Sequence, residues 1–249
     1  MLDFRDKTTG LAAKIPSAHG PRGLVSRFVE RAEQRAKTIG VRLAFEQDFS
    51  GLLAVHRESR KTGATLTSNF NPECGYDGRN GWWISARNTA DEVVATVAGR
   101  VYDWPRTTLA DELESFRFLY PDVERSKLPT ERCHVTAAFA RKITGKVFYG
   151  GGQWIRPDMR GKGLSAIMPR LSKVYGMSCF DFSWAVAIVE TILVRKGVAK
   201  RYGFNNLEFG VHYSGTRFGD HDCALVWLSR DEFIDDLVEV ERKPALLEG

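Results

Sequence analysis

The chain has 249 residues, of which 43% are hydrophobic and 27% are charged. This composition predicts a globular protein with a buried core and excludes fibrous and disordered classes. The longest aliphatic or aromatic run, 184–189, is far shorter than the roughly 20 residues of a membrane-spanning helix, and residues 1–20 lack the apolar core of a secretory signal. The four cysteines are widely spaced, which argues against a zinc site or a disulfide scaffold and favours a cytoplasmic protein.

Charge is unevenly distributed along the chain. The net charge of +5 favours a polyanionic partner, such as a nucleotide cofactor, nucleic acid or an anionic membrane surface. Residues 156–201 hold nine bases and three acids, a net charge of +6, whereas residues 229–249 hold three bases and seven acids, a net charge of −4. We therefore expect an anion to bind near residues 156–201.

Apolar periodicity and turn residues predict one α/β domain with two extensions. Helices are predicted over 22–39, 51–61 and 107–119. Three more are predicted further along: one that begins at Leu164, one that ends at 201–204, and one that begins with a capping box at Ser229. Strands are predicted over 41–45, 81–87, 92–104, 134–140, 146–149, 153–155, 184–189, 207–213 and 223–228. We assign 1–40 to an N-terminal arm and helix, 41–228 to the main domain, and 229–249 to an acidic C-terminal helix and tail.

A Gly-rich turn joins the predicted strand 153–155 to the next helix. Its sequence is Arg160-Gly161-Lys162-Gly163-Leu164-Ser165. The glycines let the backbone curl so that several N–H groups point at one spot, and the helix start adds further unpaired N–H groups. Such a turn is typical of a phosphate site, although a solvated basic turn explains the glycines equally well. A Walker loop and a dinucleotide fingerprint fit poorly, because Arg156 and Ala166 stand where those motifs need glycine.

Residues 155–165 resemble the acyl-CoA-binding motif of the GNAT acetyltransferase superfamily. That motif reads Arg/Gln-x-x-Gly-x-Gly/Ala. Arg160 and Gly163 match its first and fourth positions, and Ser165 stands where Gly or Ala is usual. The sequence Tyr202-Gly203-Phe204 resembles a second landmark of the family, a helix that ends in Gly-Phe. The resemblance extends over residues 41–228.

Several properties follow from this resemblance. The implied fold is a GNAT-like α/β fold: a mixed, mostly antiparallel central sheet with one splayed parallel strand pair, flanked by helices. The implied co-substrate is acetyl-CoA or another acyl-CoA, with its pyrophosphate on the turn and its pantetheine arm between the splayed strands 153–155 and 184–189. An amine attacks the thioester directly, and no metal is implied. The implied cofactor-binding residues are Ile155, Arg156, Arg160, Gly161, Lys162, Gly163, Leu164 and Ser165.

The reaction needs a base for the ammonium and an acid for the departing thiolate. In many members of the family a Tyr four residues before the Gly of Gly-Phe is the acid, but this chain has Ala199 there. Tyr202 is a candidate catalytic residue, with core packing as the alternative. Glu190, after the predicted strand 184–189, is the first candidate base, with a charge at the start of the next helix as the alternative. Three tryptophans either line an acceptor pocket or belong to the core: Trp82, Trp83 and Trp154.

The resemblance implies an N-acetyltransferase whose acceptor is a small-molecule amine, with a protein or an aminoacyl-tRNA as alternatives. It implies no membrane partner and allows a homodimer. Because the family's Tyr is absent at Ala199 and the surface outside the tail is basic, a second hypothesis is a non-catalytic module that senses CoA or binds nucleic acid. No residue pattern identifies the acceptor.

Overall fold

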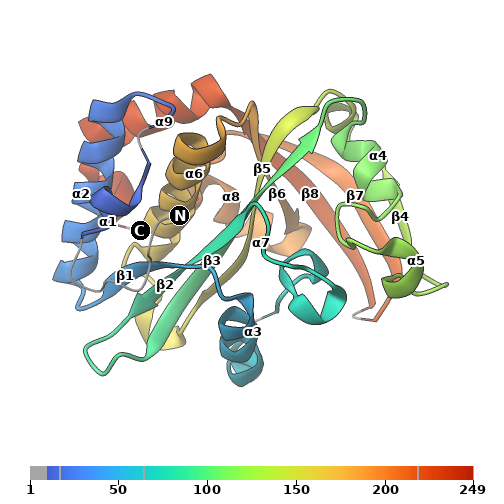
Figure 1. Cartoon of the computed structure of the whole chain (residues 1–249), viewed down its shortest axis with the longest axis horizontal. Coiled ribbons are helices and arrows are strands. Elements are labelled where there is room, and N and C mark those ends of the chain that lie inside the picture. The colour runs from blue at the N-terminus through green and yellow to red at the C-terminus, as the bar shows by residue number, and fades with distance from the viewer. Residues whose placement is uncertain (1–9, 17, 64, 218, 249) are drawn as a thin grey trace.

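The computed structural model describes residues 10–16, 18–63, 65–217 and 219–248. At its centre lies an eight-stranded sheet in the order β1-β2-β3-β5-β6-β8-β7-β4 (Figure 1). Every neighbouring pair is antiparallel except β5 and β6, which run parallel. The predicted fold class is therefore confirmed. The strands are β1 (Arg42–Glu46), β2 (Gly81–Arg87), β3 (Val93–Trp104), β4 (Arg132–Val135), β5 (Gly145–Ile155), β6 (Trp184–Glu190), β7 (Asn206–Thr216) and β8 (Gly219–Ser229).

Two groups of helices cover the two faces of the sheet (Figure 1). One face, which we call the α6 face, buries a cluster shared by α1 (Leu11–Lys14), α2 (Arg22–Thr38), α6 (Leu164–Phe180) and α9 (Arg230–Arg242). The opposite, α4 face buries a second cluster under α3 (Phe49–Glu58) and α4 (Leu109–Glu114). The remaining α-helices of the described ranges are short: α5 (Val123–Ser126), α7 (Thr191–Arg195) and α8 (Val198–Arg201). In those ranges, no helix combines the length and the apolar character needed to cross a membrane.

Local sequence signals account for the helices that frame the sheet. In α6, Leu164, Ile167 and Leu171 recur at spacings of three and four residues, and all three are buried against the sheet. Capping boxes start α4 and α9, where the hydroxyl of Thr108 or Ser229 accepts from a backbone N–H three residues later. The capping box predicted at Ser229 is thus confirmed.

The parallel strands β5 and β6 stay together over only three pairs. These are Val147–Trp184, Phe148–Ala185 and Tyr149–Val186. Beyond Tyr149, β5 remains paired with β3 and β6 with β8, but the two strands no longer pair with each other. Backbone N–H and C=O groups on their facing edges consequently lack a strand partner. This is the splayed parallel pair that the sequence predicted.

A β-bulge lies in the separated part of β5. Gly152 and Gln153 together oppose a single residue of β3, Val97. Gly152 has a φ of +58°, a conformation that glycine adopts without steric cost. The strands predicted over 146–149 and 153–155 therefore form one continuous strand, because the glycines between them create a bulge and not a turn.

Two other predicted elements are shorter in the structure. The strand predicted over 134–140 is limited to β4 and is followed by a 3-10 helix at Ala138–Arg141, and β4 pairs with β7. The helix predicted over 107–119 ends at Glu114. Phe116 has a φ of +63°, and this left-handed residue prevents the helix from continuing.

Candidate active site

Two cavities lie on opposite faces of the sheet where β5 and β6 separate. Successive residues of a strand point to opposite faces. Phe148 and Ala187 line a cavity on the α6 face, which we call the groove cavity. Their neighbours Tyr149 and Ile188 line the other, which we call the large cavity. The gap between the splayed strands thus lies between two cavities built from the same two strands.

The groove cavity has a volume of about 30 Å³ and contains an unsatisfied polar side chain. Both the nitrogen and the oxygen of the Gln153 carboxamide are buried without a hydrogen-bond partner among the described residues. Leaving a buried amide unpaired costs roughly 1–3 kcal/mol. A ligand with its own amide groups, as in a pantetheine arm, would supply the missing partners. The cavity itself is only large enough for about one water molecule, so the unpaired carboxamide marks a place where a ligand could be held once the strands move apart.

The Gly-rich turn between β5 and α6 carries positive charge. The Arg160 guanidinium donates to the carbonyl oxygens of Ile155 (3.2 Å) and Thr62 (3.1 Å). Carbonyl partners hold the side chain in place but leave its positive charge unneutralised. Lys162 lies on the exposed side of the turn with its Nζ 3.7 Å from the sulfur of Met159. Both charges favour an anion at the turn.

Other residues of the predicted cofactor site have structural partners. Leu164 is buried in the core of the α6 face, and Ile155 packs against the same cluster. Arg156 is paired with the carboxylates of Asp158 (2.7 Å) and Glu92 (3.0 Å), which offset its charge. Ser165 is half-buried in the first turn of α6.

The C-terminal segment covers one side of the turn. A Cβ atom at Gly163, where φ is +90°, would lie 2.2 Å from the carbonyl oxygen of Leu247. Leu247 ends a short 3-10 helix, Pro244–Leu247, and is buried. At Gly161, where φ is +72°, a Cβ atom would meet no described atom within 4 Å. The turn is therefore open at Gly161 and Lys162 and covered at Gly163.

We expect Gly163→Ala to destabilise the protein much more than Gly161→Ala. Both changes place a Cβ atom on a left-handed residue, which costs roughly 1–2 kcal/mol. Only at Gly163 must the new methyl group also displace the backbone of Leu247. Thermal unfolding of the two variants measures the difference, and equal decreases in midpoint would contradict the packing of the C-terminal segment on the turn.

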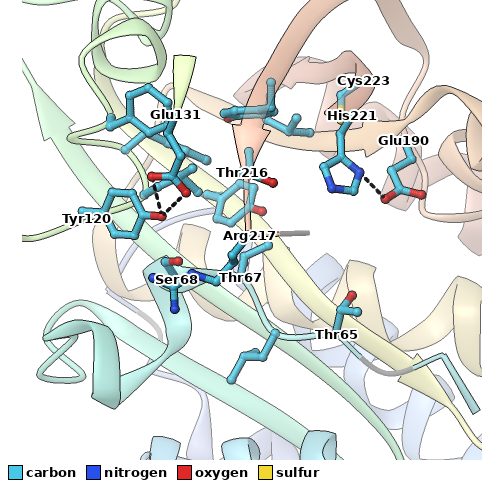
Figure 2. Close-up of a pocket in the computed structure, with 17 residues that line it drawn as sticks. Thr65, Thr67, Ser68, Tyr120, Glu131, Glu190, Thr216, Arg217, His221 and Cys223 are labelled. Carbon is cyan, nitrogen blue, oxygen red and sulfur yellow. Dashed lines mark hydrogen bonds and ion pairs between the residues drawn. The ribbon is translucent and has the colours of Figure 1, made fainter. Parts of the chain in front are cut away.

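The large cavity has a volume of about 420 Å³ and opens on the α4 face (Figure 2). Much of its wall is apolar, and its polar groups include two carboxylates, those of Glu131 and Glu190, on opposite sides of the view in Figure 2. This combination is typical of sites for small organic molecules. The apolar wall consists of Leu66, Phe116, Phe118, Leu119, Tyr149, Ile188, Tyr213 and Cys223.

Glu190, the predicted base, lies at the end of β6 and lines the large cavity beside a histidine. The Nδ1 atom of His221 lies 3.3 Å from Oε1 of Glu190 (Figure 2). Cys223 of β8 is paired with Glu190, so His221, two residues earlier on β8, points to the same face. A carboxylate at Nδ1 orients the ring and leaves Nε2 to exchange a proton with a substrate.

Glu131 lies on the other side of the large cavity and is only 2% exposed. The Tyr120 hydroxyl lies 3.0 and 3.1 Å from its two carboxylate oxygens and donates to them (Figure 2). The backbone N–H of Leu128 donates to Oε2 over 2.9 Å. All of these partners are electrically neutral.

Burial controls the protonation of the other reactive groups in the large cavity. It raises the pKa of the Cys223 thiol to about 12, so this residue stays protonated and is a poor nucleophile. Burial also raises the pKa of the Tyr149 hydroxyl, which therefore remains a hydrogen-bond donor at neutral pH. Neither group competes with His221 as a base.

Tyr202, the other predicted catalytic residue, lies on the α6 face. It lines the groove cavity and packs against the core cluster, and burial raises its pKa to about 12. Its carbonyl oxygen accepts a hydrogen bond from Nζ of Lys173 over 2.7 Å, and burial lowers the pKa of this lysine to about 7. The structure does not bring Tyr202 and Glu190 to one cavity.

The three tryptophans considered for an acceptor pocket are all buried in the core and line neither cavity: Trp82, Trp83 and Trp154.

Comparison with known proteins gives structural neighbours only. No family model and no curated protein matches the sequence. The structure is similar to Arabidopsis thaliana NAA60 in complex with acetyl-CoA, at 12% identity over 77% of this chain and 99% of that chain, with a TM-score of 0.47. It is also similar to a dodecameric spermidine N-acetyltransferase from Vibrio cholerae, at 9% identity over 77% and 95% of the two chains, with a TM-score of 0.44. A third is the CoA-dependent acyl-homoserine lactone synthase BjaI with SAM and isopentyl-CoA, at 15% identity over 81% and 83%, with a TM-score of 0.45.

The sheet itself carries the assignment of fold. Its strand order, its single splayed parallel pair and the Gly-rich turn between β5 and α6 are the features that the sequence resemblance implied. The chain has a GNAT-like α/β fold.

Proposed function

We propose that this protein is an acyl-CoA-dependent N-acyltransferase that transfers an acyl group to a small-molecule amine. The observation that carries the proposal is the pair of cavities on either side of the gap between β5 and β6. Acyl-CoA would lie along the separated edges of β5 and β6 on the α6 face with its thioester at this gap, and the acceptor amine would lie in the large cavity.

Each side chain has a defined task in this proposal. Gly161, Arg160 and Lys162 bind the phosphate end of CoA, and the Gln153 carboxamide together with the unpaired edge of β5 binds the pantetheine arm. His221 removes a proton from the acceptor ammonium through Nε2, while Glu190 orients the ring through Nδ1. The neutral amine attacks the thioester carbonyl, the C–N bond forms and the C–S bond breaks. The proton that the attacking nitrogen loses goes to the thiolate, so CoA leaves as the thiol.

Isothermal titration calorimetry with acetyl-CoA tests the first half of the proposal. We expect the wild-type protein to bind and Gln153→Leu to bind roughly 3- to 10-fold more weakly, because one or more hydrogen bonds to the ligand are lost. Gln34→Leu, a change at an exposed position of α2, is the matched control and should bind like the wild type.

Release of the CoA thiol in the presence of a panel of amines tests the second half. Thiol release that depends on an added amine would support acyl transfer. Binding of acetyl-CoA without any transfer would favour a non-catalytic CoA sensor, and absence of binding by the wild-type protein would refute the proposal.

A further inference from the structure

The carboxylate of Glu131 has no cationic partner although it is buried. Glutamate is rarely this buried unless it is paired, and moving a carboxylate out of water is costly without a compensating charge. Within the described ranges, no nitrogen of Lys, Arg or His lies within the 4.0 Å limit of an ion pair with Glu131. Among the described residues, the Tyr120 hydroxyl and the Leu128 N–H donate to it.

The basic side chains close to Glu131 have other partners or other positions. Lys127 donates to the carbonyl oxygen of Leu128, and its Nζ lies over the ring of Phe116. Arg132 donates to two backbone carbonyl oxygens, one of them that of Glu131 itself. Arg217 lines the large cavity and is exposed, and its positive charge acts on the Tyr120 hydroxyl that contacts Glu131. Among the described residues, the Glu131 carboxylate therefore accepts hydrogen bonds but forms no ion pair.

The position of Glu131 in the cavity defines what it would bind. Glu190 and His221 lie on the opposite side of the view from Glu131, with Thr216 and Arg217 between them (Figure 2). The lining of the cavity as a whole is largely apolar and includes Phe118, Tyr149 and Ile188. Apolar walls favour an apolar molecular body and disfavour charges or hydroxyl groups along its length.

We propose that Glu131 binds a second cationic group of the acceptor. The substrate class is then a molecule with an amine at each end and an uninterrupted hydrocarbon or aromatic body between them. One ammonium pairs with Glu131, and the other is deprotonated by His221 and acylated. This assignment rests on the proposed function and adds the substrate class to it.

Matched pairs of amines test the assignment. Cadaverine and pentylamine share a carbon chain and differ in one terminal amine, and meta-xylylenediamine and benzylamine form an aromatic pair. We expect each diamine to have a kcat/KM about 10- to 100-fold higher than its monoamine, the effect of one hydrogen-bonded charge pair in a buried site. Equal values, or a preference for the monoamines, would overturn the proposal.

Two variants assign the preference to Glu131. Glu131→Gln keeps the shape and an oxygen for Tyr120 and Leu128 but removes the charge, so the ratio of diamine to monoamine should fall to near one. Glu124→Gln, on the exposed side of α5, removes an equal charge outside the cavity and should keep the wild-type ratio. A wild-type ratio in Glu131→Gln would overturn the assignment.

Direct binding separates this proposal from the proposed function. Calorimetry of cadaverine with the full-length protein needs neither acyl-CoA nor turnover. Binding that weakens about 10-fold or more in Glu131→Gln would support the cation site even if no acyl transfer is found. Absence of cadaverine binding by the wild-type protein would overturn the cation site, whatever the result with acetyl-CoA.

Discussion

His221→Gln is expected to lower kcat for amine acylation roughly 10²- to 10⁴-fold, the usual contribution of a general base. Glutamine keeps much of the size of the imidazole and its ability to form hydrogen bonds, but it cannot accept a proton at neutral pH. Acetyl-CoA binding should not change, because His221 lines the large cavity and not the groove cavity. Steady-state kinetics together with calorimetry would separate the two effects.

A change at Glu190 separates orientation of the ring from proton transfer by it. Glu190→Gln should give a smaller fall in kcat, because the ring loses its orienting carboxylate but keeps both nitrogens.

His134→Gln is the matched control for this experiment. His134 also lies near a glutamate, with its Nδ1 3.9 Å from Oε1 of Glu114, but it is exposed and outside both cavities. It should retain wild-type kinetics. Full activity of His221→Gln, or an equal loss in both variants, would contradict the role of His221 as base.

The sequence predicted the sheet well because the signals involved are local. Alternating apolar residues and turn glycines placed β2, β3 and β6 closely, whereas β8 begins four residues before the predicted strand 223–228. The motif after β5 indicated where the parallel pair would separate. The Gly-Phe landmark also has a local cause: Gly203 has a φ of +77°, and a Cβ atom there would lie 2.8 Å from Cζ of Arg170. Only glycine meets both requirements.

The sequence could not predict the contents of the large cavity, because they depend on register and on long-range packing. Glu190 stood out as the end of a strand, but His221 becomes its neighbour only when β8 pairs with β6 in one particular register. Glu131 lies between the predicted helix 107–119 and the predicted strand 134–140, and nothing in its local sequence distinguishes it from an exposed glutamate. Its burial follows from contacts with Tyr120 and with β7, where the Thr130 hydroxyl donates to the carbonyl oxygen of Gly215.

Asp236→Asn is expected to be among the most destabilising conservative changes in the protein. Asp236 of α9 accepts two hydrogen bonds from Arg170 of α6, over 2.7 and 2.9 Å, and both side chains are less than one-tenth exposed. Removing one partner of a buried ion pair leaves the other charge uncompensated, at a cost of about 3–5 kcal/mol. For a chain of this size that corresponds to a fall in Tm of roughly 6–20 °C.

The same change should loosen the wall of the groove cavity. Nη1 of Arg170 donates to the carbonyl oxygen of Arg201 over 3.0 Å, and Nζ of Lys173 donates to the next carbonyl oxygen, that of Tyr202. The Arg170 guanidinium therefore joins the end of α8 to both α6 and α9. We therefore expect Asp236→Asn also to weaken acetyl-CoA binding at temperatures where the variant is still folded.

Asp231→Asn, on the same helix, is the control: it removes a carboxylate that is 92% exposed and lies 3.9 Å from its partner. It should change the free energy of unfolding by less than about 1 kcal/mol and leave binding intact. Equal stability of the two variants in thermal unfolding would show that the buried pair does not hold the two helices together.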